Sequence, residues 1–148
     1  MKNLVFKNMD LNPLFELVDS IVISSGTAKR GKGKLLKKIK ESFEEMQADQ
    51  KELYKEFFEL NEDGSIKLDK KGKFITLEGK TTEEANEKNK ELMEEPVVIE
   101  LVTFEAKIKA FYKTINEDDF TIASGRETND VVFDTLMEAL DEVFEGGE

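Results

Sequence analysis

The residues most suggestive of chemistry form a loop that resembles a calcium-binding EF-hand over residues 59–70. Asp63, Gly64 and Ile66 occupy positions five, six and eight of that template, and a predicted helix precedes the loop. Position twelve should supply a bidentate glutamate, but Lys70 stands there and puts a cation where two carboxylate oxygens must reach Ca²⁺. We therefore interpret Asp63 and Gly64 as a turn after a helix and predict no metal site.

Other catalytic chemistry has few residues to draw on. The chain contains no histidine and no cysteine, which excludes disulfides, zinc fingers, haem ligation and Ser-His-Asp or Cys-His nucleophiles. Adjacent acids occur at 44–45, 94–95 and 118–119, but neighbours on a helix point roughly a third of a turn apart and do not converge on a substrate. We predict that the chain is not an enzyme and carries no cofactor. A carboxylate-dependent enzyme stays an alternative if two acids meet in a deep pocket.

The charge balance limits the partners of the chain. Its 148 residues include 22 bases and 33 acids, a formal net charge of −11. Because phosphate contacts need a positive face, this charge argues against direct binding to nucleic acid. The apolar stretch 14–23 is short and interrupted by Glu16 and Asp19, so we expect neither a membrane span nor a signal peptide.

The charges are unevenly distributed along the chain. Residues 29–40 contain no acid, and six bases there form a candidate interaction surface: Lys29, Arg30, Lys32, Lys34, Lys37 and Lys38. After Arg126 the chain has eight acids and no base, and five of these acids form a candidate acidic surface: Asp130, Asp134, Glu138, Asp141 and Glu142. Bases early in a long helix oppose its dipole by ~0.3–1 kcal/mol each. Either the two segments neutralise each other, both are simply solvated, or one binds a partner.

Hydrophobic spacing predicts a mainly α protein of the α+β class, a long-helix hairpin or small bundle with a β-hairpin. We expect helices over residues 13–23, 34–60, 82–95, 101–115 and 126–144. Asn12 is the expected N-cap of the first helix, with Pro13 at its first position. Gly31 and Gly33 disfavour helix by roughly 1 kcal/mol each, so we place the start of the long helix near Lys34, after a flexible loop over 26–33.

The remaining elements are short. Alternating residues predict a strand over 2–7 and a β-hairpin over 64–78, which the extended segment 96–100 could join to make a small antiparallel sheet. Ser124 to Glu127 matches a capping box for the last helix. We see no internal repeat, and we expect a single domain over 1–148 with a flexible tail at 146–148.

The order of these elements resembles an uncharacterised family of small acidic proteins of temperate tailed phages and prophages of Gram-positive bacteria. The resemblance is carried by a short apolar helix before 26–30 (GTAKR), a long acidic helix ending in Glu-Asp-Gly, a lysine-rich hairpin, and a last helix after Ser124-Gly125. The sequence departs from it at Gly31 and Gly33. The resemblance implies a phage accessory or virion-associated protein and no catalytic residue.

Two functions follow as hypotheses. The first is a non-enzymatic, protein-binding accessory protein of a phage, such as an adaptor, assembly factor or minor tail component. The second is an acidic DNA mimic that inhibits a nucleic-acid-binding or defence protein of the host. In either case we expect a protein partner of phage or host, no contact with nucleic acid or membrane, and a location in the host cytoplasm or the virion. The oligomeric state stays open.

Overall fold

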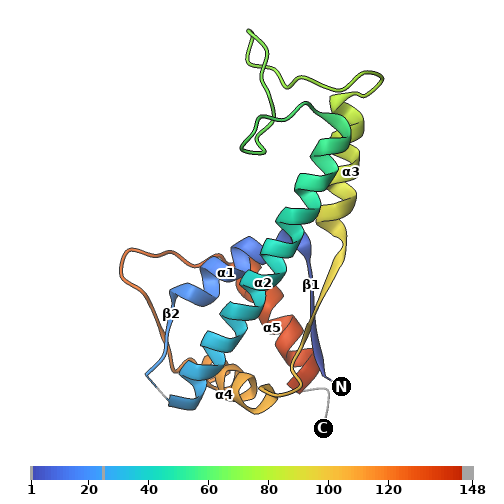
Figure 1. Ribbon diagram of the computed structural model, residues 1–148. Coiled ribbons are helices and arrows are strands. Elements are labelled where there is room, and N and C mark those ends of the chain that lie inside the picture. Colours follow the sequence, from blue (N-terminus) through green and yellow to red (C-terminus); the bar gives the residue numbers. More distant parts are fainter. Residues whose placement is uncertain (1, 25, 145–148) are drawn as a thin grey trace. The chain divides into compact units, whose positions relative to one another are not determined.

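The computed structural model describes residues 2–24 and 26–144 and has the predicted mainly α, α+β architecture (Figure 1). The chain forms two compact units, of which the first comprises residues 1–43 and 96–148 and the second residues 44–95. One long helix, α2 (Gly26–Phe57), supplies residues to both units. The tail predicted to be flexible, 146–148, lies outside the described residues.

The first unit begins with a strand, a helical turn and a short helix. In chain order these are β1 (Asn3–Lys7), the 3₁₀ helix η1 (Asn8–Asp10), α1 (Leu11–Ser20) and β2 (Ile21–Val22). The N-cap predicted at Asn12 is wrong, because α1 follows directly on η1 and Asp10 precedes its first residue. Pro13 lies in the first turn, where a missing N–H costs no helical hydrogen bond.

Helix α2 starts at Gly26, so the predicted loop over 26–33 is wrong. The reason is packing against helix α4 (Glu105–Asn116). A Cβ placed on Gly31 would lie 2.0 Å from the backbone oxygen of Lys107, so only glycine lets the two helices approach this closely. Tertiary contact therefore outweighs the low helix propensity of glycine.

We expected that segment 96–100 could join the hairpin. Strand β3 (Pro96–Glu100) instead pairs with the N-terminal strand. It runs antiparallel to β1, with Leu4 opposite Ile99 and Val5 opposite Val98. Leu4 and Ile99 are buried while both valines are exposed, so one face of this two-stranded sheet covers the core. Burial of that face explains why β1 is the preferred partner.

The C-terminal helix α5 (Asp130–Phe144) starts later than predicted. The capping box expected at Ser124 to Glu127 is wrong, because the side chain of Asn129 accepts the backbone N–H groups of Val131 and Val132 at 3.0 and 3.3 Å. Before it, β4 (Thr121–Ile122) pairs with β2. Helix α4 contacts α5 through Tyr112, whose ring stacks on that of Phe144.

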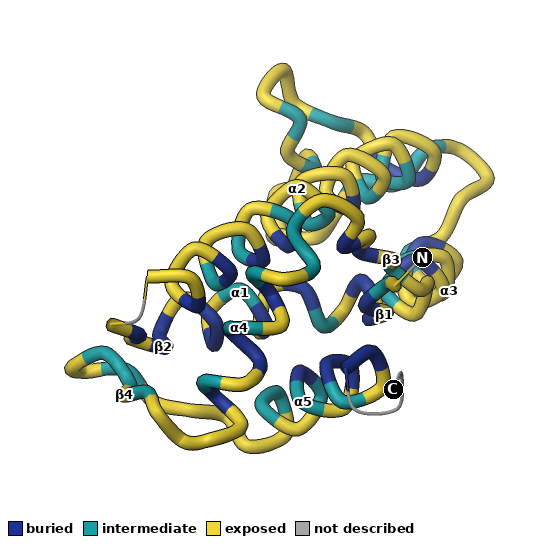
Figure 2. Tube along the Cα trace, turned by 90° about the horizontal axis from the view of Figure 1, so that it is seen from below, coloured by how far each residue is buried: buried dark blue, intermediate teal, exposed yellow. Residues whose placement is uncertain are grey.

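The core of the first unit is mainly aliphatic, with the aromatic rings of Phe6, Phe111, Tyr112 and Phe144 also buried. Its largest fully buried side chains come from β1, α1, β2, α2, α4, α5 and the residue that follows β3: Leu4, Leu11, Leu14, Ile21, Leu35, Ile39, Leu101, Ile108, Phe111, Ile115, Leu136 and Leu140. In α2, residues 28, 31, 35 and 39 form the buried stripe, while most of the remaining surface is exposed (Figure 2).

The second unit is a helical hairpin with a small β element at one end. Helix α3 (Thr82–Glu94), capped by the hydroxyl of Thr81, lies beside the C-terminal part of α2 (Figure 1), and Gln50 donates to Asn89 across them at 2.7 Å. Phe57, Phe58 and Ala85 form the core of this unit.

Segments 57–61, 65–69 and 73–77 connect the two helices and form what we call the three-segment ring. The N–H of Glu59 donates to the carbonyl of Ile75, that of Ile75 to Lys67, and that of Lys67 to Glu59, at 2.9, 3.0 and 2.8 Å. Because 59, 67 and 75 are eight residues apart, each segment pairs with both others.

The same eight-residue spacing recurs in the rest of the three-segment ring. The bridges Leu60 to Ile66 and Leu68 to Phe74 are related by it. The predicted hairpin over 64–78 is present as the bridge Leu68 to Phe74 with backbone hydrogen bonds from Asp69 to Lys73 and from Ile75 to Lys67, and both of its arms also pair with segment 57–61.

Candidate functional site

The predicted basic surface lies on the solvent side of α2 in the first unit. Lys29, Arg30, Lys34 and Lys37 are exposed, opposite the buried stripe that contains Leu35. No acid lies in the first turn of α2. The unfavourable interaction of these bases with the helix dipole is therefore not offset by a carboxylate in that turn. We refer to these four exposed bases as the basic face.

Two of the six predicted basic residues belong instead to the fold. The ammonium group of Lys38 lies 5.5 Å from the centroid of the Phe104 ring, a cation–π contact, and 3.8 Å from Glu41. Lys32 is half-buried and donates to the backbone carbonyl of Asp19 at 3.2 Å. Sequence reasoning could not separate them from their neighbours, since all six are bases on one helix.

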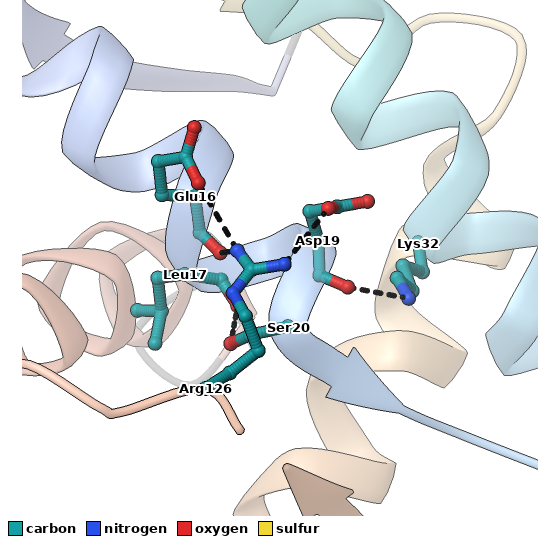
Figure 3. A network of polar contacts seen from close by, with 6 residues as sticks. All are labelled: Glu16, Leu17, Asp19, Ser20, Lys32 and Arg126. Atoms are coloured by element: carbon teal, nitrogen blue, oxygen red, sulfur yellow. Dashed lines mark hydrogen bonds and ion pairs between the residues drawn. The ribbon is translucent and has the colours of Figure 1, made fainter. Parts of the chain in front are cut away.

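The contact made by Lys32 is part of a polar network at the C-terminal end of α1 (Figure 3). The guanidinium of Arg126 donates to the carbonyl of Glu16 at 2.8 Å and pairs with the carboxylates of Glu16 and Asp19 at 3.1 and 3.3 Å. The hydroxyl of Ser20 donates to the carbonyl of Leu17 at 2.6 Å.

This network accounts for the carbonyls that α1 leaves without helical partners. Val18 accepts from the N–H of Ile21, and Ser20 accepts from that of Ala123 at 2.8 Å. Arg126 and Lys32 place two cations at the negative end of the helix dipole, which stabilises that end. The network therefore stabilises the fold. The role of Arg126 was not predicted from the sequence, because residues 124–127 had been interpreted as a capping box.

The predicted acidic surface lies on α5. Asp130, Asp134 and Glu138 are exposed and follow each other at four-residue intervals, a rise of about 6 Å per interval along the helix. They lie on the face opposite the buried residues Leu136 and Leu140, because residues four apart share one face of a helix. We refer to these three acids as the acidic row.

The other two acids of this surface are placed differently. Asp141 is half-buried and accepts a hydrogen bond of 2.6 Å from the hydroxyl of Tyr112 on α4, so it serves packing between helices. Glu142 is exposed and lies with Lys2 and Asn3 around a cavity of about 280 Å³ beside β1.

The basic face and the acidic row do not neutralise each other. Within residues 2–24 and 26–144, no ion pair joins a base of segment 29–40 to an acid of α5. Helix α4 instead packs against both helices, through Lys107 on α2 and Tyr112 on α5. Both charged faces are thus open to solvent.

In the second unit, the turn at Asp63 uses its own carboxylate. That carboxylate accepts one hydrogen bond from the hydroxyl of Ser65 at 2.6 Å and another from the backbone N–H of Ser65 at 3.0 Å. Both hydrogen bonds stabilise the ionised form and lower the pKa of Asp63. Gly64, with a φ of +89°, completes the turn in a conformation that favours glycine. Burial raises the pKa of Tyr54, which packs on the aromatic ring of Phe58.

The same unit has a groove lined mainly by acids. It lies between α2 and α3, has a volume of about 290 Å³, and is lined by Asp49, Glu52, Leu53, Glu56, Lys88, Glu91, Leu92 and Glu95. In the part of the chain that the structure describes, no three acids are grouped closely enough to hold a metal ion. None of the described helices has the length and apolar character needed to cross a membrane.

Comparison with known proteins places the chain in one family. Neither the curated proteins nor the solved structures include a significant match. Residues 2–147, nearly the whole chain, match the family described as "Protein of unknown function (DUF1617)". The chain belongs to the DUF1617 family.

Proposed function

We propose that this chain is a non-enzymatic, phage-encoded accessory protein that binds another protein, as an adaptor, assembly factor or minor tail component. The observation that carries the proposal is the pair of charged faces in the first unit, the basic face on α2 and the acidic row on α5. Each is exposed, and no ion pair joins them among the described residues. The phage setting is supported by the resemblance in element order alone.

The basic face is the stronger candidate for the binding surface. Its bases lie near the positive end of the α2 dipole, an arrangement that costs ~0.3–1 kcal/mol per charge. Neither Lys34 nor Lys37 makes an ion pair with a described residue. An anionic surface on a partner would offset this cost, whereas solvent offsets it only through screening. The rigid helix holds the charges in one geometry.

The test is affinity purification from phage-producing cells together with immunoblotting of purified virions. The variant Lys34→Glu/Lys37→Glu reverses two charges of the basic face, and Lys109→Glu/Lys113→Glu makes the same charge change on exposed positions of α4. We expect a specific phage or host protein to bind the wild type and the α4 variant but not the α2 variant. A chain that binds neither virion nor host protein contradicts the proposal.

A second candidate function is inhibition of a host nucleic-acid-binding protein by DNA mimicry. The acidic row favours it, because Asp130, Asp134 and Glu138 follow one helix face at regular spacing, as phosphates follow a strand. The test is competition with DNA for host nucleases. Asp130→Asn/Asp134→Asn/Glu138→Gln should abolish competition, and unchanged competition by this variant rejects the idea.

A further inference from the structure

The three-segment ring of the second unit offers side chains rather than a strand edge to a partner. Glu59, Lys67 and Ile75 each donate and accept within the ring, and a second set of hydrogen bonds follows the same eight-residue spacing. In that set Asn61 donates to Ser65, Asp69 to Lys73 and Leu77 to Phe57. Because the pairing closes on itself, a partner cannot add a strand to it, and contact must come through side chains.

One side of the three-segment ring leaves apolar side chains uncovered. Phe58 is 3% exposed and lies in the core of the unit, whereas Leu68 and Phe74 are 56% and 50% exposed. These two residues are bridge partners, so their side chains belong to one small patch. The ring of Phe74 rests on that of Phe58 with centroids 5.5 Å apart, which fixes its position. An exposed apolar pair held in place in this way is a feature of binding surfaces.

Lysines flank the two apolar residues in the sequence. Lys67, Lys70, Lys71 and Lys73 are exposed, and the only acid between them is Asp69. The carboxylate of Asp69 accepts the backbone N–H groups of Lys71 and Lys73 at 2.8 and 3.0 Å, so it stabilises the turn. A chain of net charge −11 thus presents a basic surface here. We call Leu68, Phe74 and these four lysines the tip patch.

We propose that the tip patch binds an acidic segment of a different protein, which places an apolar side chain against Leu68 and Phe74 and carboxylates beside the lysines. The inference deepens the proposed function and rests on it, because it adds a second binding surface and states the chemistry of its partner. Charge complementarity carries the choice of an acidic partner. The apolar pair requires that this partner also bring apolar side chains.

Two other anionic partners fit the tip patch less well. An anionic lipid surface needs apolar side chains at the apex of the loop, but Lys70 and Lys71 occupy the apex and Leu68 and Phe74 lie behind them. A single-stranded nucleic acid binds best to several aromatic rings on which successive bases stack, and Phe74 is the one aromatic residue of the tip patch. The net charge of −11 repels both polyanions.

The binding test uses a fluorescein-labelled synthetic peptide of alternating glutamate and leucine, with a lysine–leucine peptide as its control. The variants Lys70→Glu/Lys71→Glu and Leu68→Ser/Phe74→Ser alter the charge and the apolar part of the tip patch separately. The variant Lys88→Glu/Lys90→Glu makes the same charge change on exposed positions of α3. We expect fluorescence anisotropy to give about tenfold weaker binding for each tip variant, and no change for the α3 variant.

Several results would overturn the proposal. No saturable binding of the acidic peptide, equal binding of both peptides, or equal binding by the tip variants each rejects it. So does a preference for phosphatidylglycerol vesicles or single-stranded DNA over the acidic peptide, or a concentration-dependent dimer that the tip variants abolish. Circular dichroism checks that each variant is folded. The tip variants are also carried through the affinity purification, and a partner that they retain rejects the tip patch while leaving the proposed function intact.

Discussion

Gly31 of α2 lies directly against the backbone of Lys107 in α4, so closely that a methyl group on Gly31 would stand 2.0 Å from the Lys107 oxygen and 3.2 Å from the Ile108 nitrogen. Backbone atoms cannot move aside as the end of a flexible side chain can. The contact therefore sets the distance between α2 and α4, and with it the position of the basic face in the first unit.

Gly31→Ala is expected to destabilise the protein despite the better helix propensity of alanine. The added methyl group forces α2 and α4 apart, and overpacking of this kind costs about 1–3 kcal/mol, more than the ~1 kcal/mol that alanine contributes to a helix. Urea unfolding followed by circular dichroism measures the change. If Gly31→Ala unfolds at the same urea concentration as the wild type, or at a higher one, the proposed effect of the contact is wrong.

Gly33→Ala is expected to have the opposite sign. Gly33 is exposed on the same helix, and a Cβ there meets no atom within 4 Å. The substitution should stabilise the protein by roughly 0.5–1 kcal/mol through helix propensity and a less flexible unfolded chain. The same urea experiment measures it, so the two glycines are matched controls for each other. A loss of stability at both positions points to a cause other than the α4 contact.

The two glycines also show where the sequence stops predicting the fold. Hydrophobic periodicity predicts the helices, because each packs on one apolar stripe. Helix ends depend on contacts that the local sequence does not contain. Gly31 and Gly33 are identical in type, yet only one meets another helix. The start of α5 is a second example. Asn129 caps this helix in place of the expected capping box at Ser124 to Glu127, because Arg126 within that stretch contacts α1, which lies far away in the sequence.

Long-range pairing was the other limit to prediction. Strand β1 pairs with β3 although the whole segment 8–95 separates them in the chain, and nothing in the alternation of Pro96 to Glu100 distinguishes that partner from the nearer hairpin. The six bases of the candidate site were predictable as charges, but the internal contacts of Lys32 and Lys38 were not. The tip patch could not be predicted from the sequence alone. Leu68 and Phe74 are exposed because the three-segment ring covers only one of its sides, and that arrangement is visible only in the structure.

Arg126→Gln should weaken the attachment of the loop before α5 to the end of α1. The substitution removes the charge that pairs with Glu16 and Asp19 and the donor to the Glu16 carbonyl. Since these side chains are partly exposed, we expect a loss of about 1 kcal/mol at low ionic strength and less in high salt. A double-mutant cycle with Glu16→Gln, in urea at two salt concentrations, measures the coupling. Lys29→Gln is the exposed control on α2, and a coupling of zero contradicts the role of Arg126.

Ser65→Ala should raise the pKa of Asp63 toward that of a free aspartate. The side-chain hydrogen bond from Ser65 is the largest cause of the lowered pKa, and it stabilises the ionised form. A depressed pKa in the folded state means that ionised Asp63 supports the turn above the pKa of the unfolded chain. That support is lost as the pH falls through the lower pKa of the folded chain.

Carboxyl ¹³C chemical shifts during an acid titration give the Asp63 pKa in the wild type and in Ser65→Ala. Ser124→Ala, an exposed serine in the first unit, is the control and should leave the Asp63 titration unchanged. Because Asp63 is exposed, its titration should be a single local step. An Asp63 pKa that is equally low in Ser65→Ala would show that the backbone N–H of residue 65 and the nearby Lys51, rather than the hydroxyl, hold the carboxylate ionised.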